Sequence, residues 1–480
     1  MKRFRKFLLV LMLLPCCLLF NACNEPAYVT GIEKIISDGT TVTYQVNYSD
    51  GTSSNFVVEN GKDGENGKDI SIDEIFASCV EKGMYENTAS GFAEFLKDYL
   101  VVEAPTTDFK ASTNKALCSA VSVYSHFTLK NYGSYENAVA TGAGVVYKVD
   151  QASDTAYVVT NYHVVYENSS IGAKHIAEKI YLYQYGADIS IEEDTANSDA
   201  RGVKPLYTFG GDKIECTYVG GSMNYDIAVL KVKLSDLLAV NPITRTVDIA
   251  EGYEVADTAF AVGNPEGSGL SVTKGIVNVD SETISMTGVD NFTRVKFRVL
   301  RIDCAINGGN SGGGLFNEKG ELIGIVNAKI EDDSIDNMAY ALPVDNITKV
   351  ANNIIDNYKK ENKAVGVKMV VLGLTTIGTN SKFEYNEING TSKITDETLV
   401  DKVTEGGLAS EKQLQAGDII TAVAINDTSN KITLTRSFQL TELLLNVREG
   451  DEIYIYYARG DVKDNLVHIS ATKESFETIA

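Results

Sequence analysis

The residues best suited to chemistry in this sequence lie in one glycine-rich stretch around a single serine. Ser311 stands in the run Gly308-Gly-Asn-Ser-Gly-Gly-Gly314, and apolar segments lie on both sides of it. Glycine permits sharp turns and a close approach of the backbone to a substrate. The N–H groups of Gly309 and Ser311 can then point at one place, as stabilisation of an oxyanion requires. The stretch predicts either a serine nucleophile for acyl transfer or an ordinary glycine turn with an exposed serine.

A serine hydroxyl needs a base to take its proton, and the chain has only four histidines. One of them, His163, follows the strand-like segment Thr155–Tyr162 as the chain enters a turn. Asp226 stands at the start of a largely apolar segment, where its carboxylate could orient an imidazole. Either residue alone is more often structural than catalytic. Their order before Ser311 is one of the known orders of a catalytic triad, so the combination favours a serine hydrolase.

Five short motifs resemble the HtrA (DegP-like) family of trypsin-fold serine proteases. The motifs are Thr141-Gly-Ala-Gly-Val-Val146, Thr160-Asn-Tyr-His-Val-Val165, Asp226-Ile-Ala-Val-Leu-Lys231, Ala261–Val277 and Gly309-Asn-Ser-Gly-Gly313. The resemblance implies a mainly β fold, in which a chymotrypsin-like double β-barrel is followed by a PDZ domain. It places His163 and Asp226 on the first barrel and Ser311 on the second. Ahead of the barrels we expect a small N-terminal β/helical module.

The resemblance also implies a mechanism that uses no metal and no other cofactor. Ser311 attacks a peptide carbonyl, His163 transfers the proton, and Asp226 orients the imidazole. The N–H groups of Gly309 and Ser311 bind the oxyanion. The chain is therefore expected to be a serine endopeptidase.

The substrate pocket is less clearly indicated. By resemblance it is lined by Ile306 on one wall and by Ala328 and Lys329 on another. The family favours small aliphatic side chains and usually has an apolar residue where Lys329 stands. A preference for small aliphatic residues and a preference for polar or acidic ones therefore both stay open.

The first 22 residues resemble the signal peptide of a bacterial lipoprotein. A basic start leads into the apolar run Phe7–Phe20, which is short for a membrane span. Cys23 would be the lipidated first residue of the mature chain, which would then lie on the extracytoplasmic face of the cell membrane. Such signals usually carry Leu where Phe20 stands, so an ordinary secretory leader and an uncleaved anchor remain alternatives.

The net charge and the cysteine spacing of the sequence restrict the classes of ligand and partner that it can bind. The formal net charge of −22 argues against nucleic acid and against electrostatic docking on anionic lipid. The cysteines that follow Cys23 have no metal-ligand spacing, and we expect them to be small buried residues. They are Cys79, Cys118, Cys216 and Cys304.

The chain of 480 residues has room for several domains. We expect helices at about 71–82, 89–100, 344–358 and 437–445, and long polar loops at about 187–204, 378–398 and 425–433. The loop at about 187–204 is either a disordered surface loop or a regulatory one. The predicted order is a signal peptide (1–22), a β module with a glycine-rich linker (23–69), a helical spacer (70–110), a protease domain (111–358), a linker (359–363), a PDZ domain (364–472) and a tail (473–480).

In the PDZ domain, Val365, Gly366 and Val367 would form the loop that holds a peptide's terminal carboxylate. The partners implied are unfolded or exported proteins, peptide C-termini at this loop, the membrane through Cys23, and two further copies of the chain in a homotrimer. Two alternatives remain open for the function. One is a non-catalytic peptide-binding or chaperone protein, and the other is a dedicated signalling protease.

Overall fold

The computed structural model describes residues 29–37, 41–48, 52–59, 76–77, 80, 109–329, 338–386 and 391–479. The chain divides into two compact units, residues 1–108 and 109–480. The predicted signal peptide, Cys23, the glycine-rich linker, Cys79 and most of the predicted helical spacer lie outside the described residues. No helix in the described ranges is long and apolar enough to cross a membrane.

The first unit contains a three-stranded antiparallel sheet in the order β1-β2-β3. Its strands are β1 (Val29–Ser37), β2 (Thr41–Tyr48) and β3 (Ser53–Glu59). All three strands lie within the segment expected to be a β module, residues 23–69.

The second unit begins with α3 (Phe109–Leu117) and a closed six-stranded barrel. Along this barrel's strands, neighbouring residues face opposite sides. Val158 and Leu230 belong to a core cluster of this barrel, whereas Val159 and Val229 belong to a larger cluster shared with the rest of the unit. In barrel order the strands are β10 (Ile214–Ser222), β11 (Ile227–Lys233), β6 (Thr155–Thr160), β5 (Ser134–Asp150), β4 (Ala120–Asn131) and β7 (Lys179–Gln184).

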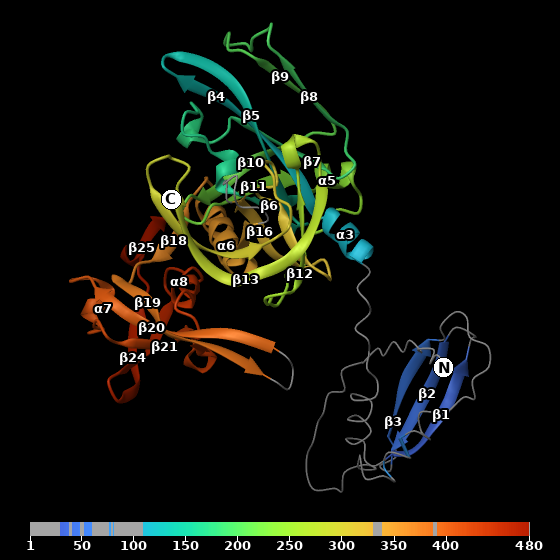
Figure 1. The fold of residues 1–480 in the computed structure, drawn as a ribbon, viewed down its shortest axis with the longest axis vertical. Helices are drawn as coiled ribbons and strands as arrows, with labels where there is room; N and C mark the ends of the chain where they lie inside the picture. Colours follow the sequence, from blue (N-terminus) through green and yellow to red (C-terminus); the bar gives the residue numbers. More distant parts are fainter. Residues whose placement is uncertain are drawn as a thin grey trace. The chain divides into compact units, whose positions relative to one another are not determined.

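A second closed barrel follows, which confirms the expected double-barrel fold. Its β13 is the long curved yellow ribbon of Figure 1, and it pairs antiparallel with β14 as far as Thr287 and Arg294. In barrel order the strands are β12 (Thr258–Gly263), β13 (Ser271–Thr287), β14 (Arg294–Ile302), β17 (Ala339–Pro343), β16 (Leu322–Lys329) and β15 (Gly314–Asn317).

Helix α6 (Val344–Glu361) packs against both barrels. Its buried apolar residues recur at helical spacing and include Ile347, Val350 and Ile354. The helix ends at Asn362, whose left-handed conformation stops it. The helix predicted at 344–358 is thus confirmed, but the residues expected as a linker at 359–363 begin as its last turn.

The polar segment at 187–204 is not wholly a loop, contrary to expectation. It contains β8 (Ile189–Asp194), which pairs with β9 (Leu206–Gly211). Ile189 and Ile191 pack against a cluster of aromatic residues on the first barrel, so the alternation of apolar and polar residues specifies a strand. Farther along, Arg201 pairs with Glu178 and Asp199 and holds the rest of the segment in place.

Residues 367–479 form a C-terminal module built on a sheet in the order β19-β20-β21-β23-β24. The prediction of a loop at 378–398 is wrong, because most of this segment belongs to the β19–β20 hairpin. The predicted tail is also partly wrong, since it contains β25. The elements are β18 (Val367–Val370), β19 (Leu374–Asn386), β20 (Thr391–Val403), α7 (Leu408–Glu411), β21 (Ile419–Ile425), β22 (Ile432–Thr433), α8 (Gln439–Leu444), β23 (Glu452–Arg459), β24 (Val462–Ser470) and β25 (Phe476–Ile479).

A buried ion pair joins this module to the second barrel. Arg298 of β14 donates from Nε to Oε1 of Glu442 in α8 at 2.7 Å, and both side chains are less than a tenth exposed.

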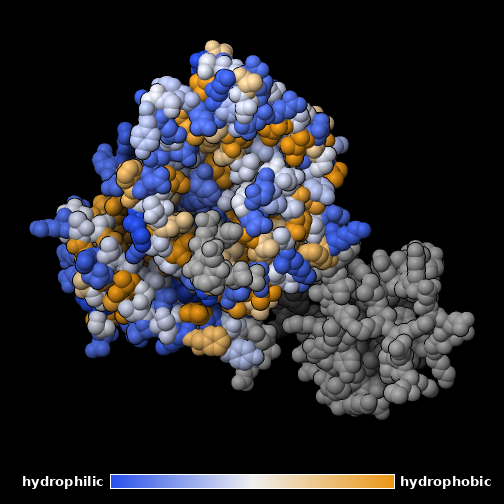
Figure 2. Space-filling model, turned by 45° about the horizontal axis from the view of Figure 1, so that its top comes forward, coloured by the Kyte–Doolittle hydropathy of each residue, from blue (hydrophilic) through white to orange (hydrophobic). Residues whose placement is uncertain are grey.

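The outer surface is mixed in hydropathy. On the face shown in Figure 2, hydrophobic residues lie in small groups among hydrophilic ones.

Candidate functional site

His163 is placed by a short helical turn that directly follows β6. The turn is α4 (Tyr162–Val165), and its residues Val164 and Val165 are buried in the first barrel. This anchoring leaves the imidazole about one-third exposed in a cleft. Its Nδ1 lies 2.7 Å from Oδ2 of Asp226, and the His163 backbone N–H donates to Oδ1 of the same carboxylate at 2.9 Å.

Asp226 is fixed by its backbone as well as by its side chain. It has a left-handed φ of 47° in the turn between β10 and β11, and its carbonyl accepts hydrogen bonds from Asn161 Nδ2 and the Tyr162 N–H. The side chain is only 10% exposed. The carboxylate can therefore hold the imidazole with Nδ1 as donor, which leaves Nε2 free to accept a proton.

Asn327, in β16 of the second barrel, completes the surroundings of this carboxylate. Its Nδ2 donates to Oδ2 of Asp226 at 2.5 Å, and its backbone carbonyl accepts from the Ser311 hydroxyl at 3.0 Å. Sequence reasoning missed this residue. The available signal was a single polar side chain inside a strand that is otherwise apolar, from Leu322 to Ala328.

Ser311 lies in the glycine-rich connection between β14 and β15. The Gly308 carbonyl accepts from the Glu266 N–H at 2.8 Å, and the Asn310 carbonyl accepts from the Gly313 N–H at 3.0 Å. Because a trans peptide is planar, the N–H that follows each carbonyl points the opposite way. The N–H groups of Gly309 and Ser311 thus face away from these turns, and neither donates to another group within the described part of the chain.

Gly309 must be glycine for two reasons. Its φ of 91° is a conformation that residues with a side chain rarely adopt, and a Cβ here would lie 2.1 Å from the Asn264 carbonyl oxygen. The sequence pattern therefore correctly indicated a backbone that only glycine permits.

One cleft of about 450 Å³ brings His163, Asp226 and Ser311 together. Of the residues predicted for the substrate pocket, Ile306 lines this cleft. Ala328 and Lys329 lie in β16 opposite Tyr340 and Ala339, and their side chains are outside the described part of the structure. The remaining wall is mainly apolar and was not predicted; it includes Met223, Met286, Val289, Val295 and Phe297.

The electrostatics of the pair favour a protonated imidazole more than usual. Burial alone lowers the pKa of His163, but the charge of Asp226 and the hydrogen bond to it outweigh burial and raise that pKa above its ordinary value of 6.5. The neutral form, which can accept the Ser311 proton, is therefore reached at a higher pH than for a free histidine.

The loop predicted to hold a peptide carboxylate is not free in this structure. The Val365 N–H donates to the Val219 carbonyl, and the Val365 carbonyl accepts from the Gly221 N–H, each at 3.2 Å. Val367 begins β18 and pairs with Ile479 of β25. The Val365 N–H is therefore engaged within the chain here, and the carboxylate-binding role of Val365, Gly366 and Val367 stays a prediction.

Metal binding and cysteine chemistry find little support in the part of the chain that is described. No group of three or more His, Cys, Asp and Glu side chains there is arranged to hold a metal ion. Cys216 and Cys304 are buried free thiols, as predicted, whereas Cys118 is only partly buried.

Comparison with known proteins agrees with the geometry of the cleft. Residues 142–325 match the model of the trypsin-like peptidase domain. The Do-like HtrA serine protease of Lactococcus lactis subsp. cremoris is 30% identical over 345 residues, which cover 70% of this chain and 72% of the relative. An HtrA-like serine protease of Staphylococcus aureus is 30% identical over 284 residues, which cover 58% of this chain and 31% of the relative.

Solved structures are more distant. The HtrA-type protease AlgW with a decapeptide aligns with 76% of this chain and 98% of its own, at 21% identity and a TM-score of 0.46. A serine endoprotease from Yersinia pestis aligns with 76% of this chain and 97% of its own, at 23% identity and a TM-score of 0.41. From the match to the lactococcal relative, this chain belongs to the Do-like HtrA family of serine proteases and is a serine endopeptidase.

Proposed function

We propose that the chain is a membrane-anchored, extracytoplasmic endopeptidase that degrades misfolded or exported proteins through His163, Asp226 and Ser311. One observation carries the catalytic part: the ring of His163 and the carboxylate of Asp226 lie 2.7 Å apart in the cleft that Ser311 also lines. The cleft thus brings together a serine, a base and a carboxylate, contributed by the two barrels.

The chemistry follows from this arrangement. The Ser311 hydroxyl turns from the Asn327 carbonyl towards Nε2 of His163, gives up its proton to that nitrogen and attacks the peptide carbonyl. The developing oxyanion is bound by the N–H groups of Gly309 and Ser311, each contributing roughly 3 kcal/mol of barrier lowering. His163 then gives the proton to the leaving amine, and water hydrolyses the acyl enzyme by the same steps in reverse order.

The raised pKa of His163 assists the transfer of the Ser311 proton to the imidazole. An imidazolium that forms beside Asp226 is stabilised by the carboxylate, so proton transfer from Ser311 becomes less costly. Asp226 itself remains a positioning group and does not take up the proton.

The experiment that tests the nucleophile is hydrolysis of casein by the purified mature chain. We expect Ser311→Ala to abolish it, while Ser190→Ala, the same change on the β8–β9 hairpin outside the cleft, leaves it unchanged. Hydrolysis by Ser311→Ala at the rate of the unchanged chain would refute the assignment, whereas inactivity of the unchanged chain would favour the non-catalytic peptide-binding alternative.

The remaining parts of the proposal rest on the sequence. The leader motif supports lipidation at Cys23 and a place on the outer side of the cell membrane; incorporation of labelled palmitate, lost in Cys23→Ala, tests it. The C-terminal module has the motif order of a PDZ domain, so we propose that it binds peptides. A homotrimer is proposed by resemblance, and the mass of the soluble mature chain in solution tests it.

A further inference from the structure

The C-terminal module carries a strand edge that the chain itself covers. β18 follows directly on the predicted carboxylate loop and pairs antiparallel with β25. The register places Val367 opposite Ile479, Met369 opposite Glu477 and Val370 opposite Phe476. A peptide that binds by adding a strand to this edge would need the same main-chain groups that β25 now occupies.

At the opposite edge of β18, the main-chain groups of Lys368 are already bonded to another part of the chain. The side-chain amide of Asn353 on α6 donates to the Lys368 carbonyl at 2.7 Å and accepts from the Lys368 N–H at 2.9 Å. Successive residues of a strand point these groups to opposite edges. Val367 and Met369 therefore present theirs to β25.

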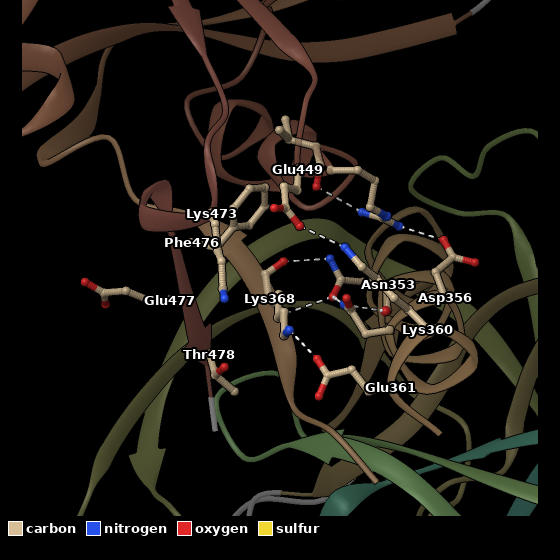
Figure 3. A pocket seen from close by; sticks show the side chains of 13 residues that line it. Asn353, Asp356, Lys360, Glu361, Lys368, Glu449, Lys473, Phe476, Glu477 and Thr478 are labelled. Carbon is tan, nitrogen blue, oxygen red and sulfur yellow. Dashed lines mark hydrogen bonds and ion pairs between the residues drawn. The ribbon is translucent and has the colours of Figure 1, made fainter. Parts of the chain in front are cut away.

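β25 is held by few side chains. Glu477 and Thr478 are exposed, and only Phe476 and Ile479 reach apolar clusters, Phe476 that of the C-terminal module and Ile479 that of the barrels. Beside the strand opens a cavity of about 710 Å³ with a charged lining, to which Phe476, Glu477 and Thr478 contribute. Figure 3 shows these three residues on one strand, across from Lys368 and the residues of α6.

β18 contacts the turn that carries Asp226. Tyr225, the neighbour of Asp226 in sequence, donates from its hydroxyl to the Met369 sulfur at 3.7 Å. Val365, two residues before β18, pairs with Gly221 at the end of β10. The strand β18, on which a peptide would lie, is therefore linked directly to β10, the strand that leads into the turn at Asp226.

From these contacts we infer that the β18 edge is the docking surface for an extended peptide, and that β25 is its resident occupant, which an incoming peptide displaces. The partner is an extended polypeptide strand with two apolar side chains three positions apart, one for each face, as Phe476 and Ile479 are in β25. This inference rests on the proposed peptide-binding role of the module. It adds that the peptide binds at the β18 edge and competes there with β25.

The test uses a fluorescent peptide that copies residues 472–480 and measures its binding by anisotropy, in a Ser311→Ala background so that no peptide is cut. We expect the full chain to bind it at least tenfold more weakly than two opened variants, one lacking residues 476–480 and one carrying Phe476→Asp with Ile479→Asp. Glu477→Ala with Thr478→Ala, both exposed positions, is the matched control and should behave like the full chain. A peptide with Asp in place of Phe476 and Ile479 should not bind.

Equal binding by the full chain and the opened variants would overturn the resident-occupant inference while keeping the peptide-binding role. Absence of binding to folded opened variants would overturn both. If the variants do not fold, hydrogen exchange on the full-length Ser311→Ala chain decides: the amides of Val367 and Met369 should exchange at least tenfold faster than paired amides of β21, and equal protection would contradict a displaceable strand. None of these readouts requires the nucleophile, so they are independent of the casein assay.

Discussion

Replacement of Asn327 by alanine tests whether the carboxylate of the proposed catalytic pair, His163 and Asp226, needs support from the second barrel. Asn327→Ala removes a buried hydrogen bond of 2.5 Å from an amide to the charged side chain of Asp226, while both hydrogen bonds from His163 remain. A hydrogen bond to a charged group contributes about 1.5–3 kcal/mol. If this support is felt fully in the transition state, kcat falls about 10- to 150-fold.

The assay is steady-state hydrolysis of a peptide substrate between pH 5 and 9. Because Asp226 loses one donor, its charge acts more strongly on His163, and the pKa that governs the acid limb of kcat/KM should move upward. KM should change little, since Asn327 supports the carboxylate rather than the substrate. Asn346→Ala, which alters another buried asparagine at the start of α6, is the control for general destabilisation.

A kcat within twofold of the unchanged enzyme, with an unmoved acid limb, would refute the reasoning. It would mean that the bonds from His163 alone position Asp226. A loss of activity that Asn346→Ala reproduces would refute it as well, because the effect would then belong to folding.

Three further predictions follow from the contacts described above. In the unchanged enzyme, kcat/KM should fall as the pH drops through a pKa above 6.5, because His163 must be neutral to act as a base; half-maximal activity at or below pH 6.5 would contradict this. Glu442→Ala leaves Arg298 buried without its main partner and should lower the free energy of unfolding in urea by about 3–5 kcal/mol, against less than about 1 kcal/mol for an exposed pair. Gly309→Ala should lower kcat by about 100- to 1000-fold, whereas Gly133→Ala, with the same φ of 91° and open space around it, should leave kcat unchanged; equal effects would show that strain alone matters.

The residues of the proposed catalytic site could be singled out because each stands in a distinctive local sequence. Gly309 and Ser311 lie in a turn whose glycines have no other explanation, and His163 and Asp226 flank strands with clear apolar patterns. Asn327 could not be predicted with the same ease. It lies 101 positions from Asp226, and a single polar side chain in a buried strand does not show which group of the other barrel it meets.

The errors in the fold have a common cause. Segments 187–204 and 378–398 are polar enough to look like loops, yet β8 pairs with β9, and β19 pairs with β20, along their whole lengths. A strand exposed on one or both faces carries little apolar signal, and its main-chain pairing depends on a partner that the local sequence does not identify. The same applies to β25, whose partner β18 lies more than 100 residues earlier.

The position of Asn327 bears on when, during synthesis and folding, this chain acquires proteolytic activity. The histidine and the aspartate belong to the part of the chain that is made first, whereas the serine and the amide that grips the carboxylate come later. A nascent chain in which only the first barrel has folded holds the imidazole of His163 beside the carboxylate of Asp226, but it lacks the Ser311 nucleophile. With the proposed triad, proteolytic activity should therefore arise only when the two barrels have closed on each other, so an incompletely synthesised chain should not cut other proteins.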